Sequence, residues 1–217
     1  GLSELTCEQL KITGIDEQQL MLMPWLVPPS FTNYEPKPQV KTLRQILFIG
    51  SEMTAEMYEL QQKAAVKGIS LHWLDDKNQL HLLEPEWLSQ YDVIIGNEYV
   101  VPKALALGIP LFLAVNNYVE GYLGADNLER HAFDHFSGIS LRNCPDSDEW
   151  LSLLQSGYPQ AAEWALHNRL YWEQKYGISG VMDRLLSRTL AVKCPVLDSQ
   201  ACYAFTLHRK ALLAPQS

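Results

Sequence analysis

Short apolar runs alternate with amphipathic stretches through the middle of the chain. The apolar runs are rich in Val, Ile, Leu and Phe and end at or just before a glycine or a polar residue, which is typical of strands buried on both faces of a sheet. These predicted strands span residues 45–50, 70–74, 92–96 and 110–115. The stretches between them predict helices over residues 51–68, 85–91 and 102–107. This alternation predicts an α/β fold, a Rossmann-like parallel sheet with helices on both faces and a helical C-terminal extension.

The first predicted helix has the clearest pattern. Ser51 is placed to cap it, Gly68 is placed to end it, and its apolar residues recur at helical spacing. Those apolar residues are Met53, Met57, Leu60 and Ala64. A strand, a tight turn and a helix therefore form the first unit of the predicted domain.

The residues before position 42 predict an arm outside the sheet. A helix is predicted from Ser3 to Ile12 and a short strand from Gln19 to Met23. The polar segment from Pro28 to Lys41 carries regularly spaced prolines. It predicts a linker or an arm that lies on the surface.

After residue 115 the sequence predicts a polar loop and then helices. The loop NNYVEGYLGADN contains glycines, and Asp126 or Asn127 is placed to cap the helix that follows. Further helices are predicted over residues 148–154, 160–176 and 181–190, with Asp146 or Ser147 as the first cap and a break at residues 157–159. The resulting division is an arm at 1–41, a Rossmann-like domain at 42–190 and a tail at 191–217.

Composition and charge narrow the range of partners. The chain has 217 residues, enough for one domain with appendages. Its net charge of -8 and its lack of a lysine- or arginine-rich run argue against nucleic acid and anionic membranes as partners. No apolar run reaches the roughly 18 residues of a membrane span, and the start lacks a signal-peptide pattern. We therefore predict a cytoplasmic protein with a small soluble ligand. The first residue is Gly, so we expect a piece of a longer protein.

The cysteines and histidines lack the spacing of a metal site. His131 and His135 stand four apart and could share a helix face, but RHAFDH lacks the glutamate of HExxH. The cysteines form no CxxC pair, so buried free thiols are predicted. They are Cys7, Cys144, Cys194 and Cys202. We predict no metal and no bound cofactor.

Ligands of open parallel sheets bind outside the carboxyl ends of the strands. This rule selects residues 50–52, 75–76, 96–99 and 116–121. Gly50 and Ser51 can hold a diphosphate through backbone amides and a hydroxyl, or they can form a plain helix cap. Asp75 and Asp76 can accept hydrogen bonds from a ribose diol, but D-D-K-N also suits a turn, which we favour.

The segments RQILFIGS, DVIIGNEYVVPKALALGIPLFL, GYLGADN and HFSG occur in an order that resembles a known family. The resemblance is to the C-terminal, donor-binding half of a bacterial GT-B glycosyltransferase, similar to family 4, over about residues 10 to 190. Members typically read D-V-V-x-G-x-G-R-x-A-L-E-A-L-A-x-G-x-P-V, then a glycine-rich segment and N-F-S-G.

The resemblance implies a nucleotide sugar as the substrate of this domain. The saccharide or other cell-surface acceptor would be held by an N-terminal domain that this chain lacks, so the chain alone would be inactive. The donor diphosphate would lie near Gly50, Ser51 and the loop that contains Asn116, Asn117 and Gly121. The nucleoside would lie near Asn97, Glu98, Tyr99 and Lys103.

Two departures from the family pattern leave the activity open. Glu98 and Tyr99 stand where the family has its second glycine and its arginine, and Lys103 stands where it has a ribose-binding glutamate. Lysine has no acceptor, so it cannot replace that carboxylate. Either Lys103 meets the diphosphate while Glu98 accepts the ribose, or Lys103 is a solvated surface residue of a degenerate module for protein interaction or regulation. A receiver-like signalling domain is a third reading, but no aspartate ends a strand at the phosphoacceptor position.

Overall fold

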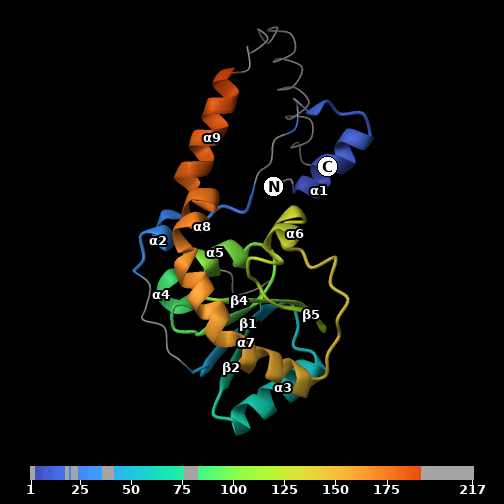
Figure 1. Ribbon diagram of the computed structural model, residues 1–217, viewed down its shortest axis with the longest axis vertical. Coiled ribbons are helices and arrows are strands. Elements are labelled where there is room, and N and C mark those ends of the chain that lie inside the picture. Colours follow the sequence, from blue (N-terminus) through green and yellow to red (C-terminus); the bar gives the residue numbers. More distant parts are fainter. Residues whose placement is uncertain (1–2, 18–19, 21–23, 36–41, 76–82, 192–217) are drawn as a thin grey trace, which may run out of the picture. The chain divides into compact units, whose positions relative to one another are not determined.

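A five-stranded sheet with the order β2-β1-β3-β4-β5 forms the centre of the protein in this computed structural model (Figure 1). The strands are β1 (Gln45–Gly50), β2 (Ser70–Asp75), β3 (Val93–Gly96), β4 (Leu111–Val115) and β5 (Tyr118–Tyr122). The structure describes residues 3–17, 20, 24–35, 42–75 and 83–191. The chain divides after Val181 into two compact units, and the sheet belongs to the first.

The sheet is mostly parallel, as predicted. β1 pairs in parallel with β2 and β3, and β3 pairs in parallel with β4. β5 is antiparallel to β4, with Val115 opposite Tyr118 and a register shift between Leu113 and Ala114. The prediction of a loop at 116–127 is therefore wrong for its first half, because a tight turn at Asn116 and Asn117 returns the chain along the edge of β4.

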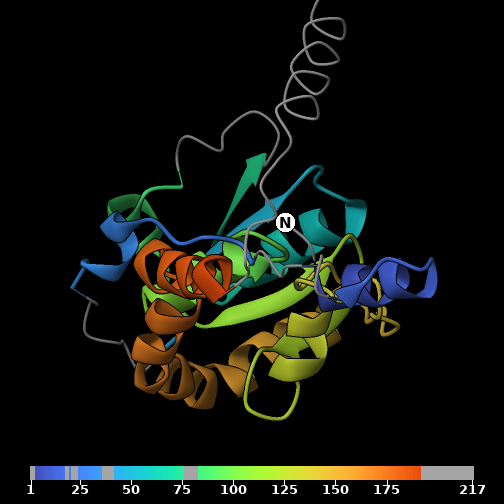
Figure 2. The same ribbon diagram turned by 90° about the horizontal axis from the view of Figure 1, so that it is seen from above.

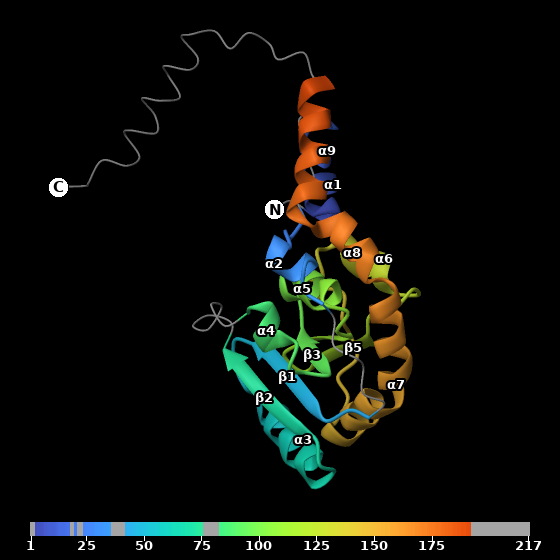
Figure 3. The same cartoon turned by 90° about the vertical axis from the view of Figure 1, so that its left-hand side faces the viewer.

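Helices cover both faces of the sheet, as predicted (Figure 3). On one face, α3 (Ala55–Val66) and α7 (Ser147–His167) pack on side chains such as Ile46 and Phe48. On the other, α2 (Pro29–Thr32), α4 (Pro85–Leu88), α5 (Val100–Ala106) and α8 (Arg169–Tyr176) pack on side chains such as Leu47 and Ile49. The remaining helices are α1 (Glu4–Ile12), α6 (Leu128–Phe133) and α9 (Ile178–Ala191). Burial on two faces explains the continuous apolar runs of the inner strands.

The helix after β1 begins later than the sequence predicts. Its cap is Thr54, whose hydroxyl oxygen accepts a hydrogen bond from the backbone N–H of Met57 at 3.3 Å. The prediction that Ser51 caps this helix is therefore wrong. A non-helical segment from Ser51 to Thr54 separates β1 from α3 and leaves the Ser51 hydroxyl outside the helix.

The long helix α7 continues through Pro159, where the sequence predicts a break. Proline at position 159 removes the hydrogen bond to the carbonyl of Gln155, four residues earlier, and contacts from β5 hold the neighbouring turn. The Tyr122 hydroxyl donates to the backbone carbonyl of Leu154 at 2.8 Å, and its ring lies where a Gly157 side chain would be. The interruption comes instead at Asn168, where α7 leads directly into α8 (Figures 1 and 2).

Part of the predicted surface arm is buried in the core. Val27 and Phe31 are almost fully enclosed. The backbone N–H of Val27 donates to the Tyr176 carbonyl at 2.9 Å, and the Ile178 N–H donates to the Val27 carbonyl at 3.2 Å. Val27 precedes the predicted surface segment, in which Pro29, Ser30, Asn33 and Glu35 are exposed as predicted and Phe31 is buried. The strand predicted at 19–23 lies, apart from Leu20, outside the described residues, as do residues 36–41.

The C-terminal region is helical, as predicted. α9 crosses the boundary between the two units, and the tail after Ala191 lies outside the described residues. Among the helices that the structure describes, none combines the length and the apolar composition needed to cross a membrane.

Arg169 ties three helices together through backbone carbonyls. Its guanidinium donates to the carbonyl of Ala106 at 2.8 Å, to that of Thr32 at 2.9 Å and to that of Tyr34. Lysine cannot reproduce this planar set of donors. Arg169→Lys should therefore lower the free energy of unfolding by about 1 to 3 kcal/mol, since carbonyls are left unpaired.

Urea unfolding followed by circular dichroism measures this difference. Arg44→Lys is the matched control, because Arg44 is exposed and the same chemical change there should be nearly neutral. Equal effects of the two substitutions would contradict the bridging role of Arg169.

Candidate functional site

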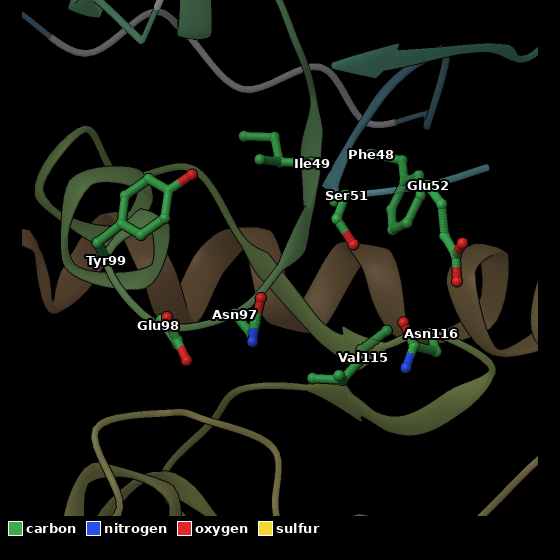
Figure 4. Close-up of a pocket in the computed structure, with 11 residues that line it drawn as sticks. Phe48, Ile49, Ser51, Glu52, Asn97, Glu98, Tyr99, Val115 and Asn116 are labelled. Carbon is green, nitrogen blue, oxygen red and sulfur yellow. The ribbon is translucent and has the colours of Figure 1, made fainter. Parts of the chain in front are cut away.

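A pocket of about 170 Å³ lies at the carboxyl ends of β1, β3 and β4 (Figure 4). The chain leaves β1 toward β2 on one side and later returns to β3 on the other, so the pocket is at the topological switch point of the sheet. Open α/β sheets bind their ligands at this point. The lining residues are Phe48, Ile49, Gly50, Ser51, Glu52, Asn97, Glu98, Tyr99, Ala114, Val115 and Asn116.

On the β1 side of the pocket, the backbone at Gly50 packs closely against the ring of Phe48. A side chain at this position would come within 2.8 Å of the Phe48 ring. The indole N–H of Trp73, on β2, donates to the Gly50 carbonyl at 3.0 Å. This end of β1 is therefore fixed by its neighbours, and Ser51 and Glu52 follow it directly into the pocket.

The β3 side of the pocket is a strained turn. Glu98 has a φ of 51°, in the left-handed region that residues with side chains rarely adopt. Its backbone N–H donates to the Phe136 carbonyl at 2.9 Å, and the Asn97 side-chain amide donates to the Ser137 carbonyl at 3.4 Å. The segment HFSG therefore supports the segment GNEY, although the two are far apart in sequence.

The β4 side of the pocket is the turn that starts β5. Asn116 lines the pocket and has a φ of 53°. Asn117 does not line it, because the Thr54 hydroxyl donates to its side-chain oxygen at 2.8 Å. Hydrogen bonds from the backbone N–H of Glu56 and then from the Asn117 side chain lower the pKa of Glu56. Asn117 thus links the turn to the start of α3.

The structure brings together most of the residues that the sequence proposes for donor binding. Those that line the pocket are Gly50, Ser51, Asn97, Glu98, Tyr99 and Asn116. Asn117 bonds to Thr54 before α3, and Gly121 lies within β5 opposite Leu113, so neither residue is part of the pocket lining. Strained backbone at both Glu98 and Asn116 is typical of functional turns.

Lys103 is not among the pocket residues. Its Nζ lies 5.4 Å from the centre of the Phe31 ring and 5.8 Å from that of the Tyr99 ring, which are cation-π distances. Burial lowers the pKa of Lys103, and the charge of Glu84 partly opposes this. Lys103 is thus half-buried against these two rings, and neither the diphosphate partner nor the solvated surface residue describes this position in full.

The charge of the pocket is negative. Glu52 and Glu98 are its charged lining residues, and the described lining contains no Lys, Arg or His. Carboxylates accept hydrogen bonds and repel anions. The pocket therefore suits hydroxyl groups better than phosphate groups.

Other candidates from the sequence lie elsewhere. His131 is buried in α6, whereas His135 follows that helix with a φ of 59°, so the two do not share a helix face. Within the described residues no group of acidic, His or Cys side chains could hold a metal. Asp75 ends β2 and is not part of the pocket lining, and Asp76 lies outside the described residues.

The cysteine prediction is correct in part. Cys7 is a buried free thiol, as predicted, but Cys144 is exposed because it lies in the irregular segment before α7. Cys194 and Cys202 lie outside the described residues.

The sequence did not indicate the supporting role of the segment from Phe136 to Gly138. The HFSG motif was the available signal, but its contact with Asn97 and Glu98 required the fold.

Comparison with known protein families, with curated proteins and with solved structures gives no match for this chain.

Proposed function

We propose that the pocket binds a nucleotide sugar and that the chain is the donor-binding domain of a GT-B-type glycosyltransferase. The observation that carries the proposal is that the segments after β1, β3 and β4 meet at the switch point of the sheet. Two segments that resemble the family, which contain Gly50 and Asn97, line the same pocket together with Asn116, which begins the loop where the resemblance puts the diphosphate. The sugar acceptor would be held by another domain.

The chemistry of the lining suits a ribose or a hexose. Glu98 can accept hydrogen bonds from two neighbouring hydroxyls, which is the task of the carboxylate that the sequence lacks at position 103. Asn97 and Asn116 add amide donors and acceptors. A volume of about 170 Å³ is below the roughly 300 Å³ of a small ligand site, so one sugar ring would enter and the diphosphate would lie at the rim.

A second function is favoured by a different observation. The lining carries two carboxylates and, among the described residues, no cation to neutralise a diphosphate. Lys103, the basic residue of the family-like segment DVIIGNEYVVPKALALGIPLFL, is outside the pocket lining and lies over the rings of Phe31 and Tyr99. These features support a degenerate transferase-like module that acts through protein interaction or regulation.

Titration calorimetry with UDP, GDP and their glucose and mannose conjugates tests the first function. We expect binding in the millimolar range or tighter. We also expect Glu98→Gln to weaken it by about tenfold, because a hydrogen bond to a charged acceptor becomes one to a neutral acceptor. Glu163→Gln is the matched control, since Glu163 is exposed on α7 and outside the pocket lining.

Two results would count against the proposal. If no nucleotide or nucleotide sugar releases heat at millimolar concentration, donor binding fails and the interaction module is the better function. If binding occurs but is equally strong in the Glu98→Gln and Glu163→Gln variants, the ligand does not contact Glu98.

A further inference from the structure

A second cavity, of about 550 Å³, lies between the β5–α6 connection and α7. Phe112 forms part of its floor and pairs with Tyr122 at the amino end of β4. The switch-point pocket, in contrast, lies at the carboxyl end of β4. The groove is therefore separate from the pocket, and its volume is within the usual range for small-molecule sites.

One wall of the groove is held rigid by Asn127. Its side-chain oxygen accepts from the backbone N–H of Gly124 at 2.9 Å. Its side-chain amide donates to the Tyr122 carbonyl at 3.0 Å and to the Glu120 carboxylate at 3.3 Å. Glu120 also forms an ion pair with Arg130. The connection is thus preformed, which lowers the entropic cost of binding a ligand.

Glycines keep this wall open. A Cβ at Gly121 or Gly124 would meet no atom within 4 Å, so neither glycine is required by packing. Gly121 has a φ of +104°, which explains its presence, whereas Gly124 has no such conformation. A side chain at Gly124 would occupy open space on a wall of the groove.

The opposite wall combines an aromatic surface with neutral hydrogen-bonding groups. Trp164 is half-buried and lines the groove beside Gln160 and Ser156 of the same helix. The charge of Glu120 is offset by Arg130, which leaves Asp126 as the other charged lining residue. Among the described lining residues there is no Lys, Arg or His, so an anionic ligand is disfavoured.

We propose that this groove binds a neutral saccharide. A sugar ring has an apolar face that can lie on the Trp164 indole and hydroxyls that can bond to Gln160, Ser156 and Asp126. Such a site is additional to the nucleotide-sugar pocket and does not depend on it.

Saturation-transfer NMR of the full chain with maltose, cellobiose, lactose and N,N′-diacetylchitobiose tests the proposal. We expect at least one of these probes to bind. Gly124→Leu should abolish its signal, because the new side chain fills the groove. Trp164→Ala should weaken binding by about three- to tenfold through loss of the aromatic contact.

Matched controls are available on α3. Ala65→Leu adds carbon atoms to an exposed position, and Tyr58→Ala removes an exposed aromatic ring. Both should bind as the unaltered chain does. Circular dichroism identifies any variant that fails to fold, and Gly124→Leu remains informative if Trp164→Ala is unstable.

Two results would overturn the proposal. Either no saccharide of the panel binds the unaltered chain, or binding is unchanged in Gly124→Leu and Trp164→Ala. If the first result is obtained and choline, added as a cationic probe, gives a signal that Gly124→Leu abolishes, the groove is assigned to an organic cation. The Glu98→Gln variant changes the other pocket and not this groove. Nucleotide binding and saccharide binding can therefore fail independently, and each is measured with its own ligand and its own variants.

Discussion

Gly138→Ala is expected to lower the free energy of unfolding by about 2 to 5 kcal/mol, the sum of a backbone cost and a steric cost. Gly138 has a φ of +74°, a conformation that alanine adopts only with strain. A Cβ at this position would also lie 2.3 Å from Cγ2 of Val115, which is far below van der Waals contact. Chemical unfolding measures the combined loss.

Gly68→Ala separates the two costs. Gly68 has the same φ of +74°, but a Cβ there would meet no atom within 4 Å. This control should lose only the backbone contribution of about 1 to 2 kcal/mol. Adding Val115→Ala to Gly138→Ala removes the clashing methyl group, so the double variant should lose less than the sum of the two single changes.

Gly138→Ala should also disturb the switch-point pocket. Gly138 follows the residues whose carbonyls accept from Asn97 and Glu98. A displaced segment would lengthen these hydrogen bonds and release the strained turn at Glu98. If Gly138→Ala and Gly68→Ala have equal effects on stability, the close approach to Val115 is not a determinant of this fold.

Trp172→Ala is expected to cost about 3 to 5 kcal/mol of unfolding free energy, as truncations of fully buried large aromatic residues do. Trp172 is fully buried and stacks on Tyr176, with ring centres 5.2 Å apart and an angle of 21° between the planes. Its ring also lies 6.2 Å from that of Phe136. It therefore connects α8 to the segment that supports the pocket.

Trp172→Phe is the informative companion. The indole N–H of Trp172 is buried without an acceptor among the described residues, so phenylalanine removes an unsatisfied donor while it keeps a ring in the core. Its cost should be less than half that of Trp172→Ala. Thermal and urea unfolding compare the two, and equal losses would mean that the indole N–H has a partner or that the full ring volume is required.

The strands and most helices were predictable because their signals are local. The runs that became β1, β3 and β4 are apolar at successive positions, which is typical of strands buried on both faces. The incorrect predictions also came from local signals. Ser51 and Thr54 are both good caps, and Pro159 normally interrupts a helix, so neighbouring residues alone could not choose between the alternatives.

The site was predictable in part for the same reason. The carboxyl ends of parallel strands meet at one edge, so Gly50, Asn97 and Asn116 could be grouped before the fold was known. Asn117 and Gly121 were grouped with Asn116 because residues 116–127 were predicted as one loop, whereas a tight turn at Asn116 and Asn117 starts β5 and places Gly121 opposite Leu113.

By itself the sequence determined the alternation of strands and helices, the buried residues of the inner strands and the edge of the sheet at which the pocket lies, since these depend on the pattern of residues along the chain. Only the tertiary structure decided that Phe136 and Ser137 hold the turn of Asn97 and Glu98, and that Lys103 lies over Phe31. Such contacts join segments far apart in sequence, and they exist only when the packing of the whole sheet brings those segments together.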